Sequence, residues 1–163
     1  MRTLVVAALV LAVTGCASAP IEQRTTQGPT AEQVYVARVY AQNGRQPTFE
    51  ERGHWQHQMD RQIAQYLQQH PEVANSFDVQ AFRFTRQVTV GMVKEQATIL
   101  LGPPSSTVTD AAALEKLARK YWPDIKGKAT EALVYPGGWN LFVANDRVVD
   151  ITQYVERPPL LRK

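Results

Sequence analysis

Histidine and carboxylate side chains lie close together in one stretch of this sequence, EERGHWQH at residues 50–57. On a helix, Glu50, His54 and His57 would share nearly one face, and such a set could hold zinc for hydrolysis. Arg61 would lie one turn beyond His57 on that face, where a fixed cation disfavours a divalent metal. We therefore interpret these residues as the solvent side of a helix and predict no metal site. A metal-assisted hydrolase using His54 and His57 is kept as an alternative.

The serine residues and the other carboxylates do not form a recognisable catalytic arrangement. Ser105 and Ser106 have no plausible histidine and aspartate partners, and the segment GPPSS that contains them lacks the Gly-Lys-Ser/Thr of a phosphate-binding loop. The carboxylates of the C-terminal part are scattered along the chain: Asp124, Glu131, Asp146 and Asp150. We predict a protein without enzymatic activity and without a cofactor.

The clearest predicted chemistry belongs to Cys16, the single cysteine of the sequence. It follows a basic start and an apolar run from Leu4 to Val13, the pattern of a secretory signal. That run is shorter than the about 20 residues that span a bilayer. The sequence Val13-Thr14-Gly15-Cys16 has the order of a bacterial lipobox, in which small residues admit the signal peptidase and the thiol receives the lipid. We predict that residues 1–15 are a signal peptide and that Cys16 is acylated.

The predicted lipid anchor also predicts a location. Several acyl chains attach a protein stably to a membrane, whereas one chain attaches it marginally. Ala17 follows Cys16 where an aspartate would retain a lipoprotein in the inner membrane, so we expect the periplasmic face of a bacterial outer membrane. Acylation of Cys16 would leave no thiol for disulfides or thiol catalysis.

The charge balance of the chain is nearly even. It has 18 Lys and Arg against 15 Asp and Glu, and removal of the predicted signal peptide takes away Arg2. The basic residues are dispersed along the sequence. We therefore predict no nucleic-acid partner and only a weak preference for acidic lipid headgroups.

The mature chain is long enough for one domain with a modest core. Residues 16–29 are polar and contain proline and glycine, which predicts a flexible tether. Residues 30–87 have the apolar spacing of helices, and residues 88–155 predict a mixed α+β domain. Residues 156–163 are expected to form a frayed tail.

The helical region divides into three predicted helices. Thr30 caps the first, which ends at Asn43-Gly44, and Thr48 caps a longer second helix that ends at His70-Pro71. The apolar residues of the second helix form one stripe: Trp55, Met59, Ile63, Tyr66 and Leu67. The third helix is predicted to start at Ser76 with these apolar residues on one face: Phe77, Ala81, Phe84 and Val88.

The α+β region begins with a short predicted helix whose apolar side carries Val93, Ala97, Leu100 and Leu101. A brief strand at 107–109 and an amphipathic helix at 110–121 follow, with Pro123 beyond the end of that helix. Three strands are then predicted at residues 130–135, 139–144 and 147–153. The separators Pro136-Gly137-Gly138 and Asn145-Asp146 are typical of hairpin turns, which predicts an antiparallel meander.

Two glycine-containing motifs bracket the short helix: VGMVKEQA at residues 90–97 and LGP at residues 101–103. Together with Val134-Tyr135, Leu141-Phe142-Val143 and the hairpin into VVDI at 148–151, they make the segment from Val88 to about Thr152 similar to a known family. The segment resembles the SmpA/OmlA family of small outer-membrane lipoproteins, the BamE-like proteins.

The resemblance implies a fold in which helices pack on a three-stranded antiparallel sheet. It implies structural roles for Gly91, which would turn the chain into the short helix, and for Gly102, which would end it in the left-handed C′ conformation. Pro103 would then block any further helical turn. Val93 stands where the family has threonine, so the N-cap hydrogen bond would be lost at a cost of about 1 kcal/mol.

Taken together, the lipobox and the resemblance predict a lipid-anchored, non-catalytic envelope protein that acts as an outer-membrane assembly or scaffold module by binding another protein. Tyr135 and Trp139 flank the Pro-Gly-Gly turn and are expected either to pack on the sheet or to form an exposed aromatic edge for that partner. An inhibitor of a periplasmic enzyme is the alternative from the binding class.

Overall fold

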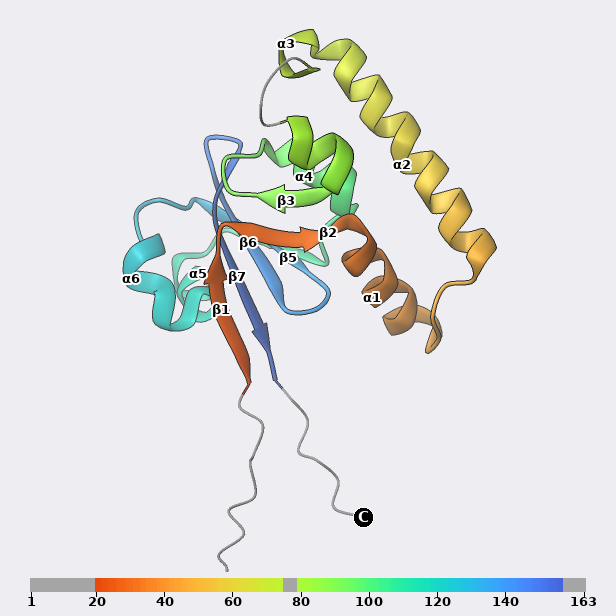
Figure 1. Ribbon diagram of the computed structural model, residues 1–163. Helices are drawn as coiled ribbons and strands as arrows, with labels where there is room; N and C mark the ends of the chain where they lie inside the picture. Colours follow the sequence, from red (N-terminus) through yellow and green to blue (C-terminus); the bar gives the residue numbers. More distant parts are fainter. Residues whose placement is uncertain (1–19, 75–78, 157–163) are drawn as a thin grey trace, which may run out of the picture.

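The computed structural model describes residues 20–74 and 79–156. Its centre is a five-stranded antiparallel sheet with the strand order β1-β7-β6-β5-β4 (Figure 1). These strands are β1 (Ile21–Thr25), β4 (Ser106–Val108), β5 (Glu131–Tyr135), β6 (Trp139–Ala144) and β7 (Arg147–Val155). A separate antiparallel pair is formed by β2 (Gln27–Thr30) and β3 (Gln87–Thr89). The predicted α+β class is confirmed, and the sheet has five strands where the family layout implied by the resemblance has three.

The three predicted strands form the middle of the sheet as a meander, β5-β6-β7. Their turns have the backbone that the turn residues predict, because Gly137 and Gly138 have φ of 81° and 75°, and Asn145 and Asp146 have φ of 49° and 60°. Local turn chemistry therefore fixes this part of the fold.

The prediction of a flexible tether at residues 16–29 is wrong for residues 21–29. β1 pairs with β7 along its whole length, from Ile21 opposite Val155 to Thr25 opposite Ile151. Polar side chains of β1 find partners in the fold, as when Arg24 donates hydrogen bonds to Asp150. An edge strand of alternating polar residues resembles a linker in sequence, and its pairing partner lies more than 120 residues away along the chain.

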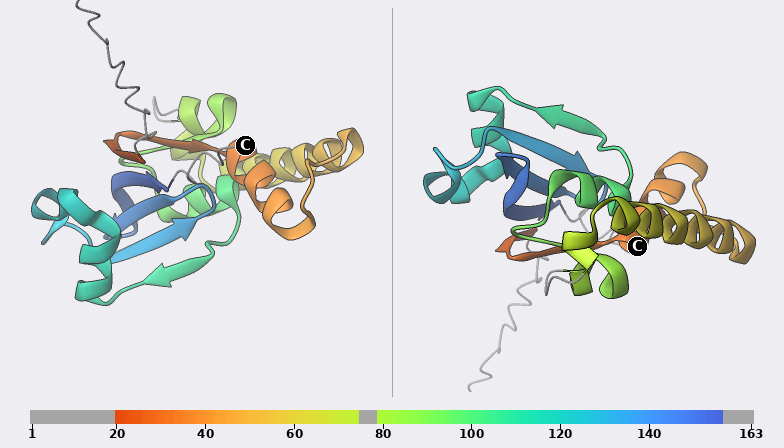
Figure 2. Two further views of the ribbon diagram at one scale, coloured as in Figure 1. Left: turned by 90° about the horizontal axis from the view of Figure 1, so that it is seen from below. Right: turned by 90° about the horizontal axis from the view of Figure 1, so that it is seen from above.

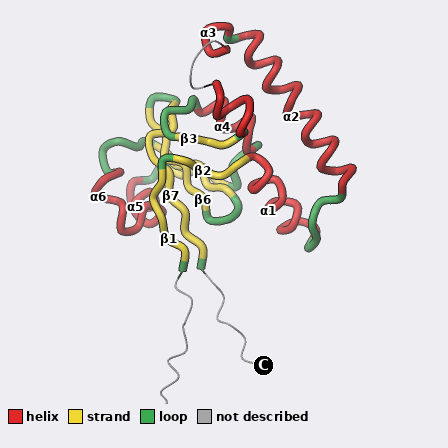
Figure 3. Tube along the Cα trace, in the orientation of Figure 1, coloured by secondary structure: helices red, strands yellow, loops and turns green. Residues whose placement is uncertain are grey.

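The helices lie on both sides of the large sheet (Figure 3). Their bounds are α1 (Ala31–Asn43), α2 (Phe49–Gln69), α3 (Pro71–Ala74), α4 (Lys94–Leu101), α5 (Ala111–Ala118) and α6 (Trp122–Ile125), with a π-helix η1 (Ala81–Thr85) and a 3-10 helix η2 (Arg119–Tyr121). None of the helices in the described ranges is long and apolar enough to cross a membrane.

The predicted caps of the first two helices are confirmed. Thr30 accepts a hydrogen bond from the backbone N–H of Gln33, and Thr48 accepts one from that of Glu51. Gly44 ends α1 with φ 68° and ψ 9°, in the left-handed region. Hydrogen bonds from Arg45 and from the backbone of Thr48 lower the pKa of Glu51 to about 2.

The predicted third helix is wrong in its buried face. Its predicted start, Ser76, and Phe77 lie outside the described residues. Beyond them the chain forms η1, where the wider π turn buries Phe82 completely and leaves Phe84 67% exposed. Val88, predicted as helical, lies in β3 and is buried. The predicted face assumed the 3.6-residue period of an α-helix, and that spacing does not apply to the wider turn of a π-helix.

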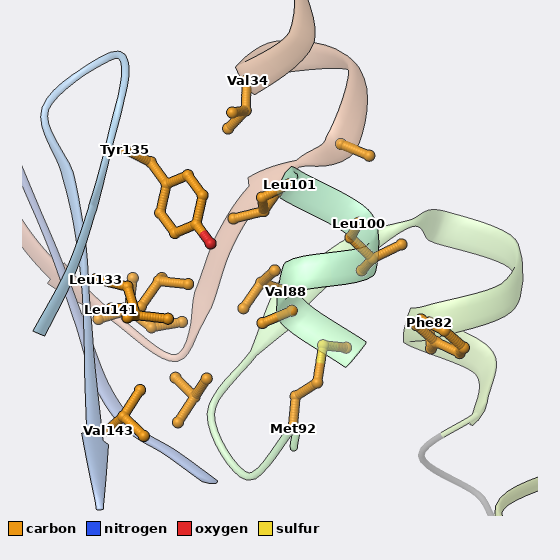
Figure 4. Packing of buried hydrophobic residues seen from close by; sticks show 14 of the residues in the cluster. Val34, Phe82, Val88, Met92, Leu100, Leu101, Leu133, Tyr135, Leu141 and Val143 are labelled. Atoms are coloured by element: carbon orange, nitrogen blue, oxygen red, sulfur yellow. The ribbon is translucent and has the colours of Figure 1, made fainter. Parts of the chain in front are cut away.

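One core joins the predicted helical region to the predicted α+β domain. From the sheet, Leu133, Leu141 and Val143 face Leu101 and Val88 across the interior (Figure 4). Buried residues of α1 and α2 belong to the same cluster: Ala31, Val34, Met59, Ile63 and Tyr66. The helices of residues 30–87 and the sheet are therefore parts of one folded unit.

The opposite face of the sheet has a smaller apolar core beneath α5 and α6. It consists of Phe142 and Ala132 from the sheet and Leu114, Ala118 and Ile125 from the helices. A register shift between Phe142 and Val143 places Asp150 opposite Phe142 and Val148 opposite Val143. Because of this register shift, polar and core residues do not simply alternate along β7.

The helix predicted at 110–121 is shorter than expected. Asp110 caps it, with its side chain accepting from the N–H of Ala113, but α5 ends at Ala118, where Arg119 takes a positive φ of 53°. η2 and α6 then follow as two further short helices, and Pro123, which lies beyond the end of α5 as predicted, is in the first turn of α6.

Candidate functional site

A groove with a volume of about 520 Å³ lies between α1, α2 and α4. Its lining is mainly apolar and comes from all three helices, including Tyr35, Trp55, Met59, Ile99 and Leu100. Seen from two further sides, α2 extends away from the sheet as a long arm (Figure 2). Concave, mostly apolar sites between helices are typical places for ligands or partner segments to bind.

A stacked aromatic pair forms part of the lining. The rings of Tyr35 on α1 and Trp55 on α2 lie 4.5 Å apart at an interplanar angle of 7°. Both side chains are half-buried. The chain reverses between α1 and α2 at Gly44, and the Thr48 cap sets the start of α2. These two local signals place the rings face to face.

The carboxyl end of α4 forms the adjoining lining, and three hydrogen bonds are accepted by carbonyl groups at that end and in the two residues that follow it. Arg38 of α1 donates to the carbonyl oxygens of Leu101 and Pro103 at 3.0 and 2.8 Å. The Tyr135 hydroxyl donates to the carbonyl of Gly102 at 3.2 Å. A cation at this position also suits the negative end of the helix dipole.

Gly102 and Pro103 therefore lie in the groove lining, where the sequence placed a helix stop. Gly102 has φ 72° and ψ −170°, so the prediction of a left-handed C′ conformation is wrong in its ψ angle. This region is accessible almost only to glycine. A Cβ atom at Gly102 would lie 2.9 Å from the Arg38 guanidinium, so the glycine also makes room for that side chain.

The amino end of α4 agrees with the predicted roles. Gly91 has φ 95° and its N–H donates to the carbonyl of Val148, so the chain turns there from β3 toward the helix. Val93 occupies the N-cap without a side-chain hydrogen bond, as the sequence predicts. The Gln96 side chain accepts a hydrogen bond from the Val93 N–H at 3.3 Å, which supplies half of a capping box.

The structure separates the roles of Tyr135 and Trp139. Tyr135 is 2% exposed, so the prediction that it forms part of an exposed aromatic edge is wrong. Burial raises the pKa of its phenol to about 12, and its ring packs between the sheet and α4 (Figure 4). Trp139 is half-buried against the same core. Tyr135 thus supports the groove lining through its hydrogen bond to Gly102, whereas Trp139 lies outside that lining.

His54 and His57 are both exposed on α2, outside the residues that line the groove. Within residues 20–74 and 79–156, no group of three or more His, Cys, Asp and Glu side chains is placed to hold a metal ion. The predicted lipidation residue, Cys16, lies outside the described residues.

The exposed part of the groove carries one acidic group among several amides. Glu95 lies in the first turn of α4, exposed and without an ion pair in the described part of the chain. Gln58 and Gln62 are exposed on α2. Arg38, the cation of the lining, is already bonded to two carbonyl oxygens. The groove thus offers an apolar floor, hydrogen-bonding amides and one free carboxylate, and this arrangement suits binding better than catalysis.

Sequence reasoning identified Trp55 and Met59 as members of an apolar stripe and missed the groove that they line. Tyr35 and Arg38 were not identified at all. A tyrosine and an arginine three residues apart on a helix share one face, but only the packing of α1 on α4 gives that face a role.

The chain was compared with protein-family models, curated proteins and solved structures, and no match was found in any of them.

Proposed function

We propose that this protein is a lipid-anchored, non-catalytic envelope protein that binds a segment of another envelope protein in the groove between α1, α2 and α4. The observation that carries the proposal is the half-buried Tyr35–Trp55 stack beside Ile99 and Leu100. Aromatic side chains in partly buried apolar sites supply much of the binding energy at protein interfaces.

The chemistry of the groove defines the segment that it would bind. The apolar floor requires apolar side chains, and the uncompensated carboxylate of Glu95 favours a lysine or arginine beside them. The exposed amides of Gln58 and Gln62 can donate to and accept from a backbone. The proposed partner therefore presents an apolar segment with a flanking basic residue.

The proposal includes membership of the SmpA/OmlA family for residues 88–152, with a BamE-like arrangement of α4 on the β5-β6-β7 meander. Positive φ angles at Gly91 and Gly102, at the two ends of α4, support that resemblance. Both edge strands and the first two helices would then be additions to the family fold, and the groove lies between α4 and those added helices.

The proposed anchor is acylated Cys16 at the periplasmic face of a bacterial outer membrane, and the lipobox supports it. Because β1 starts at Ile21, only residues 17–20 separate the anchor from the sheet. A fully extended chain spans at most about 18 Å between the Cα atoms of Cys16 and Ile21, against about 50 Å if the chain were free up to Thr30. The amino-terminal end of the sheet would therefore be held close to the membrane.

Co-purification from detergent-solubilised envelopes tests this function. We expect the parent protein to retain a stoichiometric envelope protein and both Trp55→Ala and Glu95→Lys to lose it. Glu95 is exposed, so Glu95→Lys is expected to leave stability within about 0.5 kcal/mol. His57→Ala, also exposed and outside the groove, is the matched control. Equal recovery with all three variants would contradict the proposed groove.

A further inference from the structure

A separate hollow of about 520 Å³ lies between β1, β7, the turn that joins β5 to β6, and the start of α1. It shares no lining residue with the groove between α1, α2 and α4, so what it binds does not depend on the proposed function. None of the described residues that line the hollow carries a charge. Five of them are glutamines and one is a tryptophan: Gln23, Gln27, Gln33, Gln87, Gln153 and Trp139.

Three of these side chains form a row across neighbouring strands. Gln23 of β1 is opposite Gln153 of β7, and Gln153 is opposite Trp139 of β6. Directly paired residues of antiparallel strands point to the same face of a sheet, so the two amides and the indole lie together. The Gln23 amide donates to Gln153 at 2.7 Å, and the Gln153 amide donates to the carbonyl of Gly137 at 2.9 Å. These two bonds hold the row in one arrangement.

Two glutamines on the other side of the hollow are held in a similar way. Nε2 of Gln87, on β3, donates to the carbonyl of Gly28 at 2.9 Å. Oε1 of Gln33, on α1, accepts from the backbone N–H of Thr30 at 2.9 Å. Each bond uses one end of the side-chain amide, so the position of the amide is set while its other end stays available to a ligand.

The available atoms include both donors and acceptors of hydrogen bonds. Within residues 20–74 and 79–156, Oε1 of Gln23 and Oε1 of Gln87 accept no hydrogen bond, and Nε2 of Gln33 donates none. The exposed Gln27 makes hydrogen bonds through its backbone and leaves both ends of its side-chain amide unbonded in that part of the chain. Since an amide group has two donor hydrogens and one acceptor oxygen, the hollow can pair with groups of either kind.

Gly137 keeps one edge of the Trp139 ring open. A Cβ atom at residue 137 would lie 3.3 Å from Cδ1 and 3.6 Å from Nε1 of the indole, so a side chain there would cover the N–H edge. The half-buried ring packs on the core and also lines the hollow. It therefore offers an apolar surface and one further donor beside the amides.

We propose that this hollow binds a neutral saccharide. Each sugar hydroxyl both donates and accepts hydrogen bonds, which matches amides that offer both kinds of group. The C–H face of a pyranose ring can pack on the apolar surface of Trp139. A phosphorylated or ionised ligand would lose hydration in the hollow without gaining a counter-charge. A peptide added to a sheet bonds to the main chain of a strand edge, whereas the available atoms here belong to side chains of several elements.

The indole N–H signals in an NMR spectrum test this inference, because the three tryptophans lie in three different places. Trp55 lines the groove, Trp122 begins α6 and Trp139 lines the hollow. The full chain is purified in a detergent without sugar headgroups, and each signal is assigned from its loss in a Trp→Phe variant. Tetrasaccharides of α-linked glucose, β-linked glucose and β-linked N-acetylglucosamine are then added up to about 10 mM. We expect at least one of them to shift the Trp139 signal saturably and to leave the other two signals in place.

Glutamine variants test whether the amides carry the binding. Gln27→Ala removes an amide without a protein partner, so it should leave the fold intact and weaken saccharide binding about fivefold, the effect of one neutral hydrogen bond. Gln153→Met removes the amide that links Gln23 to Gly137 and should weaken binding by about tenfold or more. Gln56→Ala, exposed on α2 and outside the hollow, is the matched control and should bind like the parent.

Three results would overturn the inference. The first is the absence of a saturable Trp139 shift with all of these saccharides. The second is nonspecific contact, seen as equal shifts of the three indole signals or as equal weakening by Gln27→Ala and Gln56→Ala. The third is a Trp139 shift with an uncharged, end-blocked tetrapeptide and with no saccharide, which would assign the hollow to a peptide. None of these results bears on the proposed function, because the groove consists of other residues.

Discussion

The two faces of the five-stranded sheet differ in what covers them and in what they leave open. One face is covered by α1, α2 and α4, which enclose a large apolar cluster and leave the groove between themselves. The other is covered by α5 and α6 over five buried residues and carries charged groups along β1 and β7. The comparison indicates that the first face combines stability with the groove proposed to bind a partner, whereas the second holds the edge strand in place.

The charged groups of the second face connect three elements. Arg24 of β1 donates to both carboxylate oxygens of Asp150 on β7 at 2.9 and 2.7 Å, and to Asp124 of α6 at 2.9 Å. The Arg119 guanidinium lies 3.7 Å from the ring centroid of Tyr154. Because β1 follows directly from the proposed anchor, these contacts would transmit any load from the membrane into the sheet.

The largest expected effect is on the second face. Phe142 is fully buried in a cluster of only five buried residues, so Phe142→Ala should lower the free energy of unfolding by about 4 kcal/mol. Hydrogen exchange should quicken in α5 more than in α4. Denaturant titration measures the free energy of unfolding, and hydrogen exchange measures the loss of protection in each helix. Phe84→Ala, at a 67% exposed position, is the control and should change little. Equal loss of protection in α4 and α5 would show that the faces are not independent.

The next effect tests the ion pairs. Arg24→Met should lower the free energy of unfolding by about 2 to 3 kcal/mol, because it leaves Asp150 buried without its cation. The loss is below that of a fully buried pair, since 34% of the Arg24 side chain is exposed. Arg45→Met removes the exposed partner of Glu51 and should cost much less while raising the pKa of Glu51 from about 2. Thermal unfolding measures the loss of stability in each variant, and NMR titration measures the pKa of Glu51. Equal losses of stability for Arg24→Met and Arg45→Met would contradict this prediction.

On the first face, Gly102→Ala should cost about 2 kcal/mol, because alanine strains a backbone with φ 72° and ψ −170° and its Cβ displaces Arg38. Gly44→Ala has positive φ but open space around its Cβ, so about 1 kcal/mol is expected. Denaturant titration compares them. Co-purification of the proposed partner should fall for Gly102→Ala and not for Gly44→Ala, and the reverse order would contradict the assigned role of the groove.

The smallest expected effect is a gain. Val93→Thr supplies the missing side-chain acceptor at the N-cap of α4, where the backbone already has φ −67° and ψ 142°. The hydroxyl can accept from the N–H of Gln96, and stability should rise by about 1 kcal/mol. Val93→Ala is the matched variant that provides no acceptor. A thermal midpoint for Val93→Thr no higher than the parent's would argue that the Gln96 side chain already satisfies this end.

Local signals in the sequence were sufficient for much of the first face. The Thr30 and Thr48 caps, the Gly44 stop and the stripe through Met59 and Ile63 appear as predicted, because each depends on residues within a few positions of one another. The hairpins of the meander are predictable for the same reason. Asn145 and Asp146 need no distant partner to adopt positive φ.

The features that escaped prediction depend on contacts distant in sequence. β1 is recognisable only once β7 lies beside it, and Arg38 gains its role only when the end of α4 reaches it. Tyr135 could be assigned to the core or the surface only after α4 was placed against the sheet. The groove also depends on contacts that are distant in sequence. The motif residues Gly102 and Pro103 therefore predicted the end of a helix and did not predict the groove that they line.

The central claim is that the groove binds a partner segment at the membrane, and site-specific photo-crosslinking in intact envelopes tests it most directly. A photoreactive amino acid at Ile99, in the groove, should yield one crosslinked envelope protein, and the same group at Gln69 on the exposed end of α2 should not. Adding Glu95→Lys to the Ile99 variant should abolish the product. Absence of a product at Ile99, or the same products from both positions, would contradict the account.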